Sequence, residues 1–201
     1  IGRTAARLHN ATVAWPAQNR MVRHAWDDDG LLGDDPLWGR FWELAALSEE
    51  QAELMRKIRA VAAKDLRAYG HSSQTYGLIH ADLVPENVML VGDDVQLIDF
   101  DDAGFGWHMF ELATALFWLR EEPDYATIES ALFTGYTEER PLSQMDLDAL
   151  PLFMVLRGLT YLGWVHTRQN TETARELTPL FVEIVCDIAS SYLAKPDKTR
   201  V

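Results

Sequence analysis

The chain has 201 residues, enough for one domain with an ample core, and its hydrophobic content of 48% is ordinary for a globular protein. A formal net charge of −13 argues against nonspecific nucleic-acid binding. No stretch is expected to span a membrane or act as a signal peptide, and the single cysteine, Cys186, excludes an internal disulfide. We therefore expect a cytoplasmic protein with neither nucleic acid nor membrane as partner, and its oligomeric state stays open.

The first third of the chain is expected to form helices joined by a loop. Residues 1–9 have a helical pattern, which Trp15-Pro16 breaks. Residues 20–38 mix acidic and basic side chains with glycine and proline, and are expected to form a loop or a poorly ordered segment. Ser48-x-x-Gln51 is a capping box that opens an amphipathic helix, and Gly70 ends it.

The most informative stretch is residues 78–104, L-I-H-A-D-L-V-P-E-N-V-M-L-V-G-D-D-V-Q-L-I-D-F-D-D-A-G. Two short aliphatic runs, 88–91 and 95–98, are separated by a Gly-Asp-Asp turn, and this pattern predicts a β-hairpin. A tight hairpin brings its two ends together. Asn87, just before the first strand, and Asp99, just after the second, should therefore meet, with Asp82 on the loop that leads into the hairpin.

Carboxylate and amide oxygens of this kind suit a hard cation, most plausibly Mg²⁺. Phosphoryl transfer needs such a metal together with a carboxylate that orients the attacking hydroxyl. The spacing from His80-x-Asp82 to Asn87, followed by Asp99-Phe100-Asp101, matches the catalytic loop and metal motif of protein kinases. The competing interpretation is that these residues are ordinary polar residues of surface loops.

The rest of the chain is expected to be helical. The expected helices cover residues 107–120, 123–136 with proline in the first turn, a short stretch capped by Ser143, 151–168 and 177–193. A polar tail is expected at residues 195–201.

Residues 78–104 resemble the aminoglycoside phosphotransferase and choline kinase family, a group of small-molecule kinases with a protein-kinase-like fold. The resemblance implies that Asp82 is the catalytic carboxylate, that His80 is a structural member of the catalytic loop, and that Asn87 and Asp99 bind Mg²⁺. Two positions depart from the family pattern. Val84 stands where histidine is often found, and Glu111 stands where aspartate is usual. A glutamate near a helix start is also explained by the helix dipole.

The resemblance implies an α+β fold, mostly α, in which residues 1–201 form the C-terminal lobe of a kinase and the hairpin carries the catalytic loop and metal site. The sequence contains no glycine-rich loop and no strand with a phosphate-binding lysine. We therefore expect the N-terminal, nucleotide-clamping lobe to be missing and this chain alone to be nearly inactive.

The expected activity is ATP-dependent phosphorylation of a hydroxyl on a small molecule, with ATP as co-substrate and Mg²⁺ as cofactor. Asp101 and Arg157 are candidates for substrate contact, although core helices often carry one paired arginine. Three alternatives stay open: a protein Ser/Thr kinase of the stress-response type, a metal-dependent hydrolase, and a non-catalytic pseudokinase. A zinc hydrolase would need more than the one histidine near the cluster.

Overall fold

A computed structural model describes residues 1–17, 20–92 and 94–196. The chain is mostly helical, as the sequence predicts, and besides the expected hairpin it contains a three-stranded sheet that the sequence did not predict. It falls into two compact units, one formed by Ile1–Trp26 and His71–Leu147 and the other by Asp27–Gly70 and Asp148–Val201. Each unit therefore combines an early and a late stretch of the chain, a division that the sequence did not reveal.

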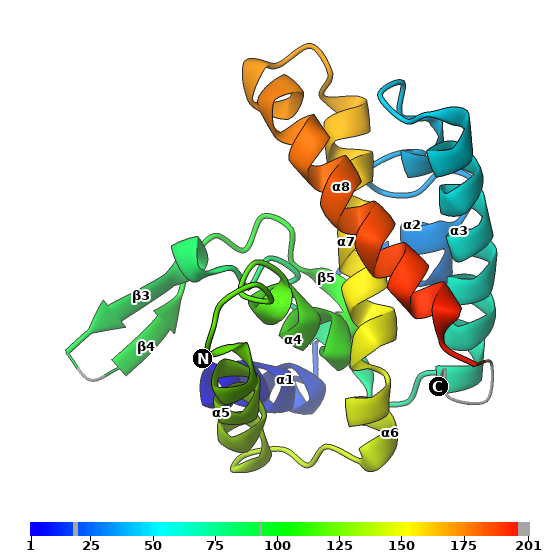
Figure 1. Cartoon of the computed structure of the whole chain (residues 1–201). Coiled ribbons are helices and arrows are strands. Elements are labelled where there is room, and N and C mark those ends of the chain that lie inside the picture. Colours follow the sequence, from blue (N-terminus) through cyan, green and yellow to red (C-terminus); the bar gives the residue numbers. More distant parts are fainter. Residues whose placement is uncertain (18–19, 93, 197–201) are drawn as a thin grey trace. The chain divides into compact units, whose positions relative to one another are not determined.

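The first unit contains small sheets flanked by helices (Figure 1). Its elements are α1 (Gly2–Ala14), β1 (Ala25–Trp26), β2 (Tyr76–Ile79), the 3-10 turn η3 (Pro85–Asn87), β3 (Val88–Val91), β4 (Asp94–Leu97), β5 (Gly104–Trp107), α4 (His108–Phe117), α5 (Tyr125–Thr137) and most of α6 (Gln144–Asp148). Strand β5 lies between β1, to which it is parallel, and β2, to which it is antiparallel. Strands β3 and β4 form the expected hairpin, which projects from the rest of its unit in Figure 1.

The register of β2 and β5 determines where the candidate site lies. Ile79, the last residue of β2, pairs with Gly104, the first residue of β5. The segment between these two residues, which includes the hairpin, therefore leaves the sheet and returns to it at the same pair of strand ends. The Gly104-Phe105-Gly106 run is part of this sheet. A Cβ at Gly104 would lie 2.6 Å from the carbonyl oxygen of His24, so the neighbouring chain can approach only a glycine there.

The second unit is a group of helices. Its elements are α2 (Asp28–Leu32), the 3-10 turn η2 (Phe41–Glu43), α3 (Glu49–Tyr69), α7 (Leu150–Thr167) and α8 (Glu172–Ala194). Helix α7 packs against both α3 and α8. The predicted capping box of α3 is confirmed, because Ser48 and Gln51 cap each other's backbone amides, and Gly70 ends the helix with a φ of 68°.

The prediction that residues 20–38 form a loop or a poorly ordered segment is wrong for seven of them, Ala25–Trp26 and Asp28–Leu32, whereas most of the others lie outside helices and strands. This segment contains β1 and α2, and the Asp27 side chain caps α2 by accepting a hydrogen bond from the Gly30 amide at 2.9 Å. Both elements are very short, and their formation depends on neighbours that are distant in sequence. Composition alone, with its aspartates and glycines, could not show this.

Two helix boundaries also differ from the prediction. Helix α5 begins at Tyr125, so Pro123 lies before it and not in its first turn. Helix α8 begins at Glu172, five residues earlier than expected, because the Thr171 side chain caps it at the Ala174 amide. Of the expected tail, Lys195 and Pro196 are described, whereas residues 197–201, like the turn residue Asp93, lie outside the described residues.

By length and composition α8 could cross a membrane, contrary to the expectation that no stretch qualifies. The same test is passed by core helices of soluble proteins, so one such helix is weak evidence for a span. In this fold the helix packs against α3 and α7, and Tyr192 on it donates a hydrogen bond to buried Asp65 of α3 at 2.8 Å.

We expect Ser48→Ala to lower the free energy of unfolding by about 1 kcal/mol, because the Gln51 amide loses its side-chain acceptor. The control is Ser190→Ala, at an exposed position inside α8, which should change it by less than about 0.5 kcal/mol. Chemical denaturation followed by circular dichroism measures both, and equal losses would contradict the capping role.

Candidate active site

The candidate site begins at His80, where the chain leaves β2. The His80 ring is fully buried, with Nε2 2.8 Å from the Ile98 carbonyl oxygen and Nδ1 3.3 Å from the Asp82 amide nitrogen. A carbonyl can only accept a hydrogen bond and a backbone amide can only donate one, so both contacts are satisfied when the proton is on Nε2. His80 in this tautomer ties the loop before the hairpin to the chain that follows it.

Asn87 holds Asp82 from the other end of the loop. Its Nδ2 donates to the Asp82 carbonyl oxygen at 2.9 Å and to the Asp82 carboxylate Oδ2 at 2.8 Å. Because both partners are acceptors, they fix which way the amide of Asn87 points. Its Oδ1 is therefore turned away from Asp82, and in the described part of the chain no hydrogen bond is found to that oxygen.

The hairpin brings Asp99 to the same end as Asn87. Val88 pairs with Leu97, and the Ile98 amide donates to the Asn87 carbonyl at 3.0 Å, so Asp99 is the next residue along. The Asp99 side chain is exposed, and its Oδ1 accepts a long hydrogen bond of 3.4 Å from the Asp101 amide. The predicted hairpin is thus confirmed, whereas metal binding by Asn87 and Asp99 stays a prediction.

Within residues 1–17, 20–92 and 94–196, no three His, Cys, Asp or Glu side chains gather into a metal-binding group. The ligand set expected here is different, since it contains one amide and one carboxylate. A site for Mg²⁺ that leaves most positions to water and phosphate oxygens needs no more protein ligands than that.

Backbone strain is concentrated in the same place. Ala81, with a φ of 65°, and Asp99, with a φ of 62°, are the non-glycine residues of the described chain in the left-handed region. Each such residue costs roughly 1–2 kcal/mol and persists only where surrounding contacts hold it. One lies directly before Asp82 and the other is the expected metal ligand.

The contact that holds Ala81 comes from Glu111 on α4. The Glu111 side chain is fully buried, and its two oxygens accept hydrogen bonds from the backbone amides of His80 at 2.9 Å and Ala81 at 2.7 Å. The sequence suggested only a helix-dipole role for Glu111, which understates it. Its departure from the family's usual aspartate was the one signal available, and it did not reveal this contact.

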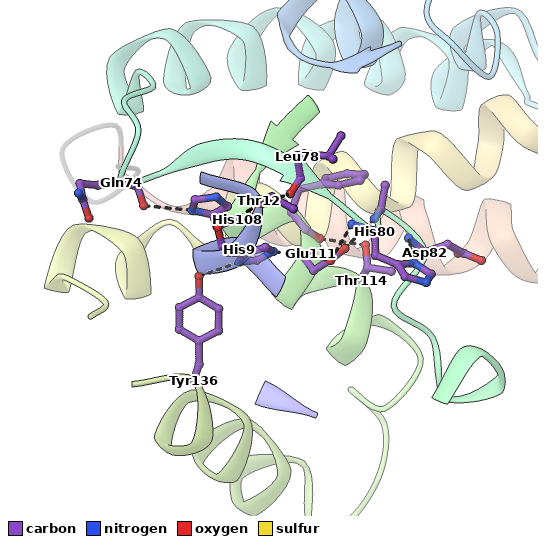
Figure 2. A network of polar contacts seen from close by, with 12 residues as sticks. His9, Thr12, Gln74, Leu78, His80, Asp82, His108, Glu111, Thr114 and Tyr136 are labelled. Atoms are coloured by element: carbon purple, nitrogen blue, oxygen red, sulfur yellow. Dashed lines mark hydrogen bonds and ion pairs between the residues drawn. The ribbon is translucent and has the colours of Figure 1, made fainter. Parts of the chain in front are cut away.

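Figure 2 shows Glu111 between the backbone of His80 and the side chain of His9 on α1. Burial by itself would raise the pKa of Glu111. Interaction with His9, together with the His80 amide, outweighs that effect and leaves the pKa below its ordinary value. The carboxylate is therefore ionised and acts purely as an acceptor for the loop.

Three residues of the segment at 20–26 clamp the chain after Asp99. Arg23 donates to the carbonyl oxygens of Ala103 and Asp101, both at 2.6 Å, and of Phe100 at 2.9 Å. The rings of His24 and Trp26 contact the Asp102 carbonyl oxygen at 3.0 and 2.9 Å. Sequence reasoning missed this clamp, because it binds backbone oxygens and leaves no motif.

The two candidates for substrate contact have different surroundings. Asp101 is exposed and follows Asp99 in the first unit. Arg157 belongs to α7 in the second unit and is 1% exposed; its Nη2 donates to the Tyr161 hydroxyl at 3.0 Å, and its guanidinium lies over the rings of Tyr161 and Trp38. This aromatic setting accounts for an arginine in an apolar helix. A role in substrate contact stays a prediction for both residues.

The family model of the phosphotransferase enzyme family matches residues 1–142, so the chain belongs to this family and the resemblance drawn from its motifs is confirmed. It is 26% identical over 186 residues to the amicoumacin kinase of Bacillus subtilis (strain 168), which covers 88% of this chain and 52% of the relative. It is 32% identical over 158 residues to the homoserine kinase of Chelativorans sp. (strain BNC1), which covers 76% of this chain and 46% of the relative.

Among solved structures, a microcompartment-associated aminopropanol kinase matches with a TM-score of 0.86 and 29% identity, over 96% of this chain and 61% of that one. The kinase-like fold is therefore established by a structural match as well as by sequence. The chain spans about half the length of the curated relatives it matches.

We expect Glu111→Gln to lower the free energy of unfolding by about 1–3 kcal/mol, because an amide NH₂ would face one of the two loop amides and leave it without an acceptor. The control is Thr114→Val, one turn along the same helix. Thr114 is also buried, but its hydroxyl bonds to the Phe110 carbonyl of its own helix, and its loss should cost less than about 1 kcal/mol. Denaturant unfolding measures both, and similar losses would show that Glu111 anchors nothing.

Proposed function

We propose that the protein transfers the γ-phosphoryl group of ATP to a hydroxyl of a small molecule, with Mg²⁺ as cofactor. The observation that carries this proposal is the double hydrogen bond from the Asn87 amide to Asp82, made at the end of a hairpin where Asp99 follows. One arrangement then supplies an oriented carboxylate and, beside it, two oxygen-bearing side chains. That division of roles is what phosphoryl transfer requires.

Asp82 is assigned to the acceptor hydroxyl. In the reaction the bond between the γ-phosphorus and its bridging oxygen breaks, a new bond forms to the acceptor oxygen, and the hydroxyl proton passes to Asp82. Because the transition state is loose, the contribution of Asp82 is mainly alignment of the attacking oxygen. The hydrogen bond to Oδ2 from Asn87 fixes the rotation of the carboxylate and supports that role.

Asn87, through Oδ1, and Asp99 are assigned to Mg²⁺, with phosphate and water oxygens completing its coordination. Both are hard oxygen donors, which fits this ion. When bound, Mg²⁺ neutralises the charge that develops on the transferring phosphates. The protein's own part is to hold these two side chains at the same end of the hairpin.

The acceptor is proposed to be a small molecule because the similar proteins are named as kinases of homoserine, amicoumacin and aminopropanol. A phosphorylation screen of the complete gene product with these compounds, choline and a Ser/Thr peptide mixture tests this choice. Transfer to peptides alone would overturn it in favour of a protein kinase. Asp101 and Arg157 are our candidates for acceptor contact.

In the complete gene product, we expect Asp82→Asn to lower kcat by roughly 10²–10⁴, the usual contribution of a positioned base, with little change in KM for ATP. The control is Glu86→Gln, which removes an exposed carboxylate from the same loop and should leave kcat nearly unchanged. Steady-state kinetics on an accepted substrate measures both. An unchanged rate in the Asp82 variant would remove this residue from the mechanism.

For the metal, we expect Asp99→Asn to raise the Mg²⁺ concentration needed for half-maximal activity by at least about 10-fold, because a charged ligand becomes neutral. The matched control is Asp94→Asn, which removes an exposed carboxylate from β4 of the same hairpin. Titration of activity with Mg²⁺ compares the two. If both variants need the same Mg²⁺ concentration as the unmodified protein, Asp99 is not a ligand.

A further inference from the structure

A single guanidinium group, that of Arg23, binds the chain directly after Asp99. Its Nε donates to the Ala103 carbonyl oxygen at 2.6 Å, and its Nη2 donates to the carbonyl oxygens of Phe100 at 2.9 Å and Asp101 at 2.6 Å. The guanidinium is planar and its N–H groups form a rigid fork. The backbone that carries these carbonyl groups must therefore have one defined shape for all of the bonds to form together.

Two neighbouring rings bind the one carbonyl of residues 100–103 that the guanidinium leaves, that of Asp102. The Nε2 of His24 lies 3.0 Å from this oxygen, and the indole nitrogen of Trp26 donates to it at 2.9 Å. Every carbonyl group of residues 100–103 is thus bound by a side chain of the segment 23–26. Successive carbonyl groups can all face one segment only where the chain turns.

The turn and the segment that binds it are both tied to the sheet. The Ala103 amide closes the turn by donating to the Phe100 carbonyl at 3.1 Å. At the next strand, the Phe105 amide donates to the His24 carbonyl at 3.1 Å, as part of the pairing of β5 with β1. Arg23 directly precedes His24, so its side chain starts from a fixed point of the backbone.

Asp99 depends on restraints from both of its neighbours in the chain. Its φ of 62° is unfavourable, and its side chain is exposed and contributes little packing. Before it, the Ile98 amide donates to the Asn87 carbonyl at 3.0 Å, and the Ile98 carbonyl lies 2.8 Å from Nε2 of His80. After it, the restraint comes from Arg23.

We propose that Arg23 is a positioning residue for Asp99: it holds the turn that follows Asp99, and through that turn it holds the Asp99 carboxylate in place to bind Mg²⁺ together with Asn87. Arg23 acts only through the backbone and is assigned neither to the metal nor to the reacting groups. The link to Mg²⁺ rests on the proposed function, in which Asp99 is a ligand. Removing a group that orients a metal ligand commonly lowers metal affinity by about 10- to 100-fold.

The positive charge of Arg23 would affect a bound cation in the opposite direction. A guanidinium beside the ligand repels a cation, so removal of the charge alone would strengthen metal binding. Loss of the positioning contacts would weaken it. The sign of the change in metal affinity therefore separates a positioning residue from a charge that is only nearby.

Hydrogen exchange of the complete gene product, measured at single amides by NMR, tests the geometry without metal or substrate. We expect Arg23→Met to reduce protection of the Ala103 amide about 10-fold or more, because the turn loses its hydrogen bonds to a charged donor. The Ile98 amide, whose acceptor is Asn87, should keep its protection. Equal loss at both amides would show a general effect on folding and overturn the proposal.

The matched control is Arg20→Met, which removes the same charge from the same segment. Arg20 is exposed, and within the described residues no hydrogen bond of its side chain is found. This variant should leave the protection of both amides unchanged.

Binding of Mn²⁺ alone, measured by electron paramagnetic resonance of the free ion, tests the link to the metal, since Mn²⁺ prefers the same oxygen ligands. We expect Arg23→Met to raise the Kd about 10-fold or more and Arg20→Met to leave it unchanged. Arg23→Lys keeps the charge but not the fork, so its Kd should be intermediate. An unchanged or lower Kd in Arg23→Met would overturn the proposal.

A double variant tests whether Arg23 acts through Asp99. In an Asp99→Asn background, Arg23→Met should raise the Kd for Mn²⁺ further by less than about 2-fold, whereas independent sites would show the full single-variant effect again. If Arg23→Met does not fold, Arg23→Lys and His24→Phe decide the question by the same measurements. His24→Phe keeps a ring but removes the contact with the Asp102 carbonyl, and it should shift both readouts in the same direction.

Failure of the proposed function would look different. A gene product that phosphorylates nothing in the screen, yet loses Ala103 protection and Mn²⁺ affinity in Arg23→Met, would refute the activity and support the positioning role. An active enzyme in which Asp99→Asn weakens Mn²⁺ binding and Arg23→Met does not would refute the positioning role alone. In an active enzyme, we also expect Arg23→Met to raise the Mg²⁺ concentration for half-maximal activity and to leave KM for the acceptor nearly unchanged.

Discussion

The buried carboxylate of Glu111 is the constraint on which the first unit depends. Removing a charged carboxylate from water is costly unless donors surround it. Here the donors are the amides of His80 and Ala81, and Nε2 of His9 lies 3.6 Å from Oε1. These groups come from a loop and two helices. The elements must therefore assemble together, because displacement of any one would leave an uncompensated charge in the core.

That constraint also explains how strained backbone persists beside Asp82. The left-handed conformation of Ala81 is unfavourable for a residue with a side chain, but the Ala81 amide is one of the two that bind Glu111. A hydrogen bond to a charged acceptor contributes about 1.5–3 kcal/mol, which is comparable with the strain. At Asp99 the equivalent restraint comes from Arg23, which binds the carbonyls of the residues that follow.

The parts of this fold that were predictable from sequence are those with local causes. The hairpin follows from two aliphatic runs and a turn, and the start of α3 follows from Ser48 and Gln51, which interact across a single turn. The roles of Glu111 and Arg23 were not predictable, because their partners are backbone groups about 30 and about 80 residues away. A backbone partner has no side-chain identity, so no sequence pattern records it.

The base of the hairpin and the middle of its strands differ in how strongly they determine the position of Asp82. Around its middle, Met89, Leu90 and Val91 are exposed, and a two-stranded hairpin of this length has little stability of its own. The end at Asn87 and Ile98, the base of the hairpin, is held by several hydrogen bonds. The Asn87 side chain donates to Asp82, the Asn87 carbonyl accepts from the Ile98 amide, and the Ile98 carbonyl accepts from the His80 ring. Accuracy of the candidate site therefore depends on the base of the hairpin and the buried anchor behind it, whereas the middle of the strands can vary without moving Asp82.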